Sequence, residues 1–100
     1  MYRVLRTDTF VRWFDRLRDR MAKDRIEMRI RRLRSGNLGD WKSVGNGVRE
    51  LRIDAGPGYR IYFGVRKQTI VILLMGGDKG TQQSDILAAR ALWKDEEDGQ

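Results

Sequence analysis

The sequence predicts an α+β domain in which a small, mainly antiparallel β-sheet follows the order β-α-α-β-β-β-α. We expect the helices to pack on one face of this sheet and to leave the other face partly open. Three observations predict it. Apolar residues recur at helical spacing in the first third of the chain, residues 47–65 alternate as two strands around a Gly/Pro turn, and residues 70–75 are continuously apolar. At 100 residues, the chain is expected to be one domain over residues 1–100.

The first third of the chain is expected to form one strand and two helices. Residues 2–6 favour a strand, and residues 7–9 offer side chains that can cap a helix. An aromatic stripe follows at positions i, i+3, i+4 and i+7, made by Phe10, Trp13, Phe14 and Leu17. We expect this stripe to be core rather than the alternative, a platform on which bases stack. A second helix is expected over about residues 21–35, ending at a Gly-Asn pair.

The remaining segments predict a loop, a buried strand and a last helix. Residues 36–47 are rich in Gly and Asn and are expected to form a loop, whose Trp41 either closes the edge of the core or contacts a partner. The apolar run at 70–75 does not alternate, which predicts a central strand buried on both faces. The last helix is expected to begin near residues 81–84. The acidic residues at its end, within 95–100, are expected to fray because negative charge there opposes the helix dipole.

Composition excludes several classes of chemistry. The chain contains no Cys and no His, which removes disulfides, thiolate metal sites, Ser-His-Asp and Cys-His catalysis and imidazole acid/base steps. We expect neither a cofactor nor a metal. The longest apolar run is far too short to cross a bilayer, and no secretory signal opens the sequence. A cytoplasmic protein without membrane association is therefore expected.

The charge is strongly basic and unevenly spread. The net charge is +7, yet residues 1–67 hold 18 Lys/Arg against 8 Asp/Glu, and residues 68–100 hold 3 against 6. Such an excess on one part of a chain is typical of nucleic-acid binding. An anionic membrane, an acidic protein partner and a merely solvated basic surface are the alternatives.

The predicted second helix carries much of this charge. The residues that we expect to position RNA are Lys23, Arg25, Arg29 and Arg32. Like charges one turn apart cost about 0.2–0.5 kcal/mol per pair unless an anion lies alongside. A phosphate backbone would relieve this repulsion. A solvent face that also meets an acidic protein is the alternative.

The predicted hairpin at 47–65 gathers polar side chains on one face. Alternation places Leu51 and Ile53 toward the core. It places Glu50 and Arg52 on the opposite face, where the second strand adds Arg60 and Tyr62. The Gly-rich turn after residue 75 is expected to bring Lys79 to the end of the sheet. A solvated face could show this set, and so could a site that cuts a phosphodiester.

These stretches resemble the RelE/ParE superfamily of type II toxins, in particular the HigB-like "addiction module killer protein" group. The resemblance rests on Thr9-Phe10 with Trp13 and Leu17, on RIEMRIRRLRSGNLGDWKSVGNGVRELRI, on GPGYRIYF and on IVILLMGGDKGTQQSDI. Together they cover nearly the whole chain. The most specific signal is the order and spacing of ELR, GYR and GGDK followed by TQ.

The resemblance implies a RelE-like fold and a toxin, most members of which cleave mRNA in the ribosomal A site without a metal. It also implies a cognate antitoxin, which we expect to be a helix-turn-helix protein encoded next to the toxin. Carried over position by position, the family's functional residues match Glu50, Arg52, Arg60 and Lys79. The histidine or tyrosine that some members place near the last helix has no match here.

Metal-free RNA cleavage uses the neighbouring 2′-OH and needs a base, cations for the phosphorane and an acid for the 5′-oxygen. We expect Glu50 to be the base, because it is the carboxylate inside the basic hairpin face. Arg52 and Arg60 would hold the phosphate. Lys79 would stabilise charge or protonate the leaving group, with Tyr62 as a second possible donor. The alternative for Glu50 is a simple ion pair with Arg52 or Arg60.

Two other functions remain open at this level. A minority branch of the superfamily poisons DNA gyrase without cutting RNA, and a basic nucleic-acid-binding module would need no catalysis. A carboxylate amid cations favours the nuclease, since binding alone does not need it. All three functions predict binding that weakens with salt.

Overall fold

The computed structural model of the chain describes residues 1–99. Its helices are α1 (Asp8–Arg16), α2 (Arg20–Arg34) and α3 (Gln82–Asp98), with a 3-10 helix η1 (Lys79–Thr81) directly before α3. Its strands are β1 (Arg3–Arg6), β2 (Trp41–Ser43), β3 (Arg49–Ile53), β4 (Tyr59–Arg66) and β5 (Ile70–Gly77). No helix in this part of the chain is long and apolar enough to cross a membrane.

The five strands form one sheet in the order β1-β5-β4-β3-β2. β1 pairs with β5 in parallel, and the other three pairs are antiparallel. The predicted α+β class with a mainly antiparallel sheet is therefore confirmed. β5 lies inside the sheet, and its residues 71–77 are all buried, as the unbroken apolar run predicts.

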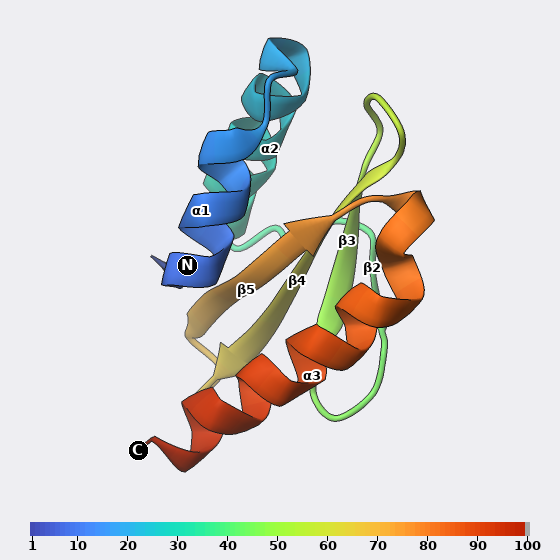
Figure 1. Ribbon diagram of the computed structural model, residues 1–100. Coiled ribbons are helices and arrows are strands. Elements are labelled where there is room, and N and C mark those ends of the chain that lie inside the picture. Colours follow the sequence, from blue (N-terminus) through green and yellow to red (C-terminus); the bar gives the residue numbers. More distant parts are fainter. Residues whose placement is uncertain (100) are drawn as a thin grey trace.

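One face of the sheet packs against α1 and α2 (Figure 1). Phe10 on α1 is fully buried, and the rest of its aromatic stripe packs around the same core. The buried members of this core are Phe10, Ile26, Ile30, Leu33, Leu51, Ile53, Ile61, Phe63, Val71 and Leu73. The stripe is core, as predicted, and Leu51 and Ile53 take the face that strand alternation assigned to them.

The other face of the sheet is covered by α3, so the expectation that all helices share one face is wrong (Figure 1). Trp93 on α3 packs into a second core that includes Tyr62 and Leu74. Gly64 makes room for this contact: a Cβ there would lie 2.4 Å from the Trp93 ring. The part of the polar hairpin face that holds Glu50 and Tyr62 therefore lies under a helix instead of facing open solvent.

Two further expectations differ from the structure. Part of the expected loop is β2, whose Trp41 pairs with Leu51; the Trp41 ring is 41 % exposed and lies beneath the Arg49 guanidinium, 4.2 Å from its centre. The acidic end of the chain continues α3 to Asp98, where an Arg66–Glu96 ion pair of 3.3 Å links it to β4. Residue 100, at the end of the segment expected to fray, lies outside the described residues.

A bulge in β5 sets the register beside the polar face. Tyr62 pairs with Met75, but the next pair is Phe63 with Leu73, so Leu74 is the extra residue. The Thr7 hydroxyl donates to the carbonyls of Leu73 and Leu74 at 3.0 and 2.8 Å, which ties the start of α1 to the bulge. Beyond it, Gly77 stands opposite Arg60.

The first core predicts a large difference between two adjacent residues of α1. Phe10→Ala should lower the free energy of unfolding by about 3–5 kcal/mol, because it removes a fully buried ring and leaves a cavity. Val11→Ala, at a position that is 38 % exposed, should change it by less than about 0.5 kcal/mol. Urea denaturation followed by circular dichroism measures both, and equal losses would contradict this packing.

Candidate active site

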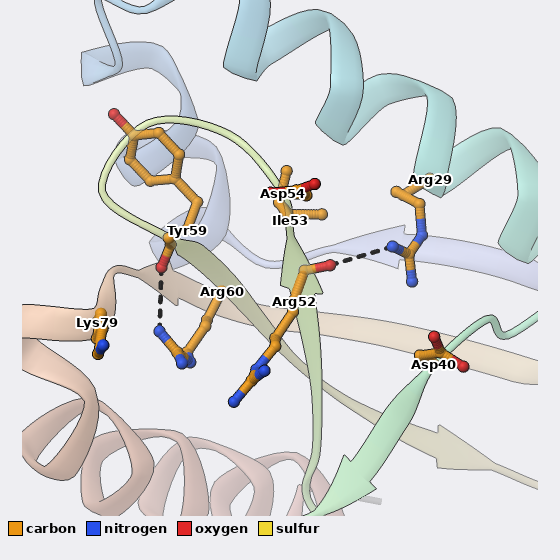
Figure 2. A pocket seen from close by; sticks show the side chains of 9 residues that line it. Arg29, Asp40, Arg52, Ile53, Asp54, Tyr59, Arg60 and Lys79 are labelled. Atoms are coloured by element: carbon orange, nitrogen blue, oxygen red, sulfur yellow. Dashed lines mark hydrogen bonds between the residues drawn. The ribbon is translucent and has the colours of Figure 1, made fainter.

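An open cleft of about 560 Å³ lies where the ends of β3 and β4 meet η1 and α2. The residues that line it are Arg29, Asp40, Arg52, Ile53, Asp54, Gly58, Tyr59, Arg60 and Lys79. Figure 2 shows Arg52 and Arg60 extending side by side from neighbouring strands, with Lys79 beyond Arg60 and with Arg29 and Asp40 on the opposite side. The structure thus brings three of the four predicted catalytic residues into one cleft.

Arg52 and Arg60 stand directly opposite each other on β3 and β4. Like charges in this arrangement destabilise an antiparallel pair. Arg52 is exposed, and in the described chain its guanidinium has no ion-pair or hydrogen-bond partner. Arg60 is only 5 % exposed. The two guanidiniums therefore concentrate positive charge at one point, which an anion between them would relieve.

Arg60 is held from two directions. Its Nη1 donates a hydrogen bond of 3.1 Å to the carbonyl oxygen of Gly58 (Figure 2). Its Nε lies 3.6 Å from Oε1 of Glu50, which is an ion pair but too long for a hydrogen bond. Both contacts leave the remaining N–H groups of the guanidinium available at the cleft.

Glu50 lies beneath the cleft and does not line it. The residue is 1 % exposed. Its Oε2 accepts a hydrogen bond of 3.0 Å from Gln82 at the start of α3, and its Oε1 lies 3.7 Å from Nζ of Lys42 and 3.6 Å from Nε of Arg60. The structure therefore contains the ion pair with Arg60 that the sequence left as the alternative for Glu50, and it does not bring this carboxylate to the surface.

Tyr62 is fully buried next to Glu50 and does not reach the cleft either. Burial raises the pKa of its phenol, and the nearby charge of Glu50 raises the pKa further. The hydroxyl lies close enough to feel this charge, yet it makes no hydrogen bond of normal geometry in the described chain. A buried phenol with a raised pKa is poorly placed to hand a proton to a substrate in the cleft.

Lys79 reaches the cleft because η1 fixes the turn after β5. Asp78 caps this short helix: its carboxylate accepts from the backbone N–H of Gly80 at 2.8 Å. Gly58, between Arg60 and Lys79, has a φ of 81°, a conformation that favours glycine, while a Cβ there would meet Nη1 of Arg60 and Cβ of Lys79 only at an ordinary contact distance of 3.7 Å. The predicted delivery of Lys79 to the end of the sheet agrees with this placement.

The arginines of α2 are partly used by the fold. Arg29 donates to the carbonyl oxygen of Arg52 at 3.1 Å, and Arg25 donates to that of Asp54. β2 pairs with β3 only as far as Leu51, so these carbonyls lie beyond its reach and the arginines take the place of the missing strand. Burial, followed by the neighbouring Arg32 charge, lowers the pKa of Arg29, and Asp40 partly opposes this.

The other two predicted RNA-binding residues, Lys23 and Arg32, do not line the cleft itself. The Lys23 ammonium sits 5.1 Å from the centre of the Phe14 ring, toward α1 and away from the cleft lining. Arg32 lines a second groove of about 260 Å³ together with Arg25, Met28, Arg29, Ile53 and Asp54. This groove shares Arg29, Ile53 and Asp54 with the cleft. The two form one basic depression along α2 and the end of β3.

Sequence reasoning missed Gln82, Lys42 and the cleft carboxylates of Asp40 and Asp54. Gln82 is the Q of the TQ in the family resemblance, but nothing in the sequence links it to Glu50, and Lys42 lies in β2, which was expected to be loop. Only their pairing with a buried Glu50 identifies them. Within residues 1–99, no group of three or more Asp and Glu is arranged to hold a metal ion.

Comparisons with known proteins place this geometry in context. A family model described as "Phage derived protein Gp49-like (DUF891)" matches residues 12–94. An uncharacterized protein of Haemophilus influenzae is 51 % identical over 86 residues, which are 86 % of this chain and 87 % of that protein. The structure of a mutant of the Escherichia coli toxin RelE in the free state has a TM-score of 0.69, covers 90 % of this chain and 94 % of its own, and is 14 % identical. The predicted RelE-like fold is confirmed; the HigB-like subgroup stays a prediction.

The raised pKa of Tyr62 predicts a pH dependence of stability. An ordinary Tyr ionises near pH 10, so above that pH the unfolded chain loses a proton that the folded chain keeps. The free energy of unfolding should therefore fall as pH rises above about 10, over and above the loss from other groups. Tyr62→Phe should be less sensitive between pH 9 and 11 in urea denaturation. Parallel curves for the two proteins would show that the phenol ionises normally in the fold.

Proposed function

Because the chain belongs to the Gp49-like family of phage-derived proteins and has the RelE fold, we propose that it is the toxin of a type II toxin–antitoxin pair. We further propose that it is an endoribonuclease, an mRNA interferase that cleaves mRNA in the ribosomal A site and so inhibits translation. The reaction needs no metal and takes place in the cytoplasm. A cognate antitoxin, expected to be a helix-turn-helix protein encoded alongside, neutralises it.

One observation carries the nuclease proposal: Arg52, Arg60 and Lys79 converge on a single cleft from three separate segments. Two of them are cross-strand neighbours whose repulsion the fold tolerates. A surface that only needed solubility would spread these charges. A dianionic, pentacoordinate phosphorus is the species that such a cluster stabilises best.

The chemistry follows from these groups. The 2′-oxygen attacks the adjacent phosphorus and gives up its proton to a water molecule, and the bond from phosphorus to the 5′-oxygen breaks as that oxygen gains a proton. Arg52 and Arg60 bind the non-bridging oxygens, because a guanidinium matches their geometry and stays charged. Lys79 stabilises the charge on the departing 5′-oxygen and serves as its proton donor in place of the buried Tyr62.

The basic depression along α2 supplies a path for the rest of the RNA. Arg32 is exposed in the second groove, which continues into the cleft through Arg29. Lys23 and Arg25 add positive charge on the same helix. Phosphates that follow this path make association steeply dependent on salt.

Ribosome dependence is supported by what the cleft lacks beside Arg60. The carboxylate that contacts Arg60, Glu50, is 1 % exposed. Figure 2 shows the two carboxylates of the cleft lining away from the Arg60 guanidinium, Asp40 on the side of Arg29 and Asp54 beside Ile53. The site thus supplies charge stabilisation more than proton transfer. An RNA that the ribosome holds in a strained, in-line geometry needs less help with proton transfer.

The test is a cleavage assay on a defined mRNA, with and without translating ribosomes, with EDTA added under conditions that keep the ribosomes intact. We expect cuts only with ribosomes and undiminished by EDTA. The rival function is tested in parallel by DNA gyrase supercoiling. Inhibited supercoiling with intact mRNA would replace the nuclease by a gyrase poison.

The cleft also predicts which cations matter. Arg52→Ala and Lys79→Ala should each slow cleavage by about 10²–10³-fold, the effect of losing one preorganised charge-stabilising donor. Because both residues are exposed, stability should change by less than about 0.5 kcal/mol. Arg31→Ala, an exposed cation of α2 outside both grooves, is the matched control. Toxicity in cells that is unchanged in the two cleft variants would remove the site.

A further inference from the structure

The least expected feature of the site is a buried carboxylate that does not line the cleft. Glu50 is 1 % exposed, and side chains from three elements lie around it. Lys42 faces it from β2, Arg60 and Tyr62 from β4, and Gln82 from α3. A base must reach the proton that it removes, directly or through one water. This carboxylate is enclosed on all of these sides.

The contacts of Glu50 form a chain that ends at Arg60. Gln82 donates to Oε2 at 3.0 Å, and Oε1 faces Nε of Arg60 at 3.6 Å. Arg60 is in turn fixed at Nη1 by the Gly58 carbonyl at 3.1 Å. The guanidinium therefore has one edge toward Glu50 and the rest toward the cleft. Catalytic hydrogen bonds are often long in a free enzyme and shorten in the complex, which suits the 3.6 Å separation.

We propose that Glu50 and Gln82 are positioning residues that orient the Arg60 guanidinium toward the scissile phosphate, and that Glu50 is not the base that accepts the 2′-proton. Glu50 offsets the charge of Arg60 in a site where Arg52 stands directly opposite. Gln82 fixes the carboxylate and couples the start of α3 to the cleft. This inference deepens the proposed nuclease function and rests on it.

A binding experiment distinguishes between Glu50 as a positioning residue and Glu50 as the base. An mRNA with 2′-deoxyribose at the cleaved position lacks the nucleophile, so its affinity reports on phosphate binding and not on proton removal. We expect Glu50→Gln to weaken binding of this RNA several-fold and Arg60→Ala to weaken it at least as much. In the Arg60→Ala background, Glu50→Gln should have no further effect, because it acts through Arg60.

Gln82→Ala keeps the inference testable if Glu50→Gln fails to fold. Gln82 is half-buried at a helix start, and its removal takes away one hydrogen bond of Glu50. It should weaken binding and slow cleavage, again without effect when Arg60 is Ala. The control is Gln83→Ala, at the next and exposed position of α3. It should match the wild type.

The pH dependence of single-turnover cleavage gives the second readout. With Glu50 as a positioning residue, Glu50→Gln lowers the rate at every pH by a similar factor and keeps the shape of the wild-type profile. Normal affinity for the deoxy RNA, together with a cleavage loss of about 10²–10⁴-fold and a vanished acidic limb, would assign Glu50 as the base and overturn the proposal. A wild type that binds the deoxy RNA but cuts no mRNA would instead refute the nuclease, while the binding cycle still decides how Glu50 acts.

Discussion

The site depends on the neutralisation of one buried guanidinium. Arg60 is 5 % exposed and stands opposite a second arginine, an arrangement that a low-dielectric interior strongly disfavours without a counter-charge. Glu50 supplies that charge. It lies on the same face of β3 as Arg52, two residues earlier in the strand. Breaking such a buried pair typically costs about 3–5 kcal/mol. The pair therefore contributes to the stability of the fold as well as to the geometry of the cleft.

Other features of the fold follow from keeping this pair in place. The α3 helix covers the face on which Glu50 lies, and its first residue, Gln82, hydrogen-bonds the carboxylate. After the bulge at Leu74, β5 ends at Gly77, opposite Arg60. The short helix η1 follows and places Lys79 in the cleft. The cleft side of the hairpin end keeps its exposed cation, Arg52. An apolar layer around Trp93 thus lies next to a polar pocket at the same sheet face.

Local patterns in the sequence determined which residues share a face, and long-range packing determined which of them are exposed. Alternation alone grouped Glu50, Arg52, Arg60 and Tyr62, and the structure keeps that grouping. It could not show that α3 crosses this face. The apolar residues of this helix are small and scattered, so they do not define one apolar face that would indicate where the helix packs. The strand β2 has only three residues between glycine-rich turns, too few for a period of two to be visible. Hence the members of the cluster were predictable, but the burial of Glu50 and Tyr62 was not.

The two α2 arginines that bond to β3 have a consequence for association between chains. An uncovered sheet edge offers carbonyl and amide groups to which a second chain can add a strand, and this is a common start of aggregation. Arg29 and Arg25 occupy the carbonyls of Arg52 and Asp54, where β2 no longer covers the edge. The same side chains that make this region basic thus close the end of β3 to another strand. The hydrogen bonding of the sheet is thus completed at this point by side chains of α2 and not by a further strand.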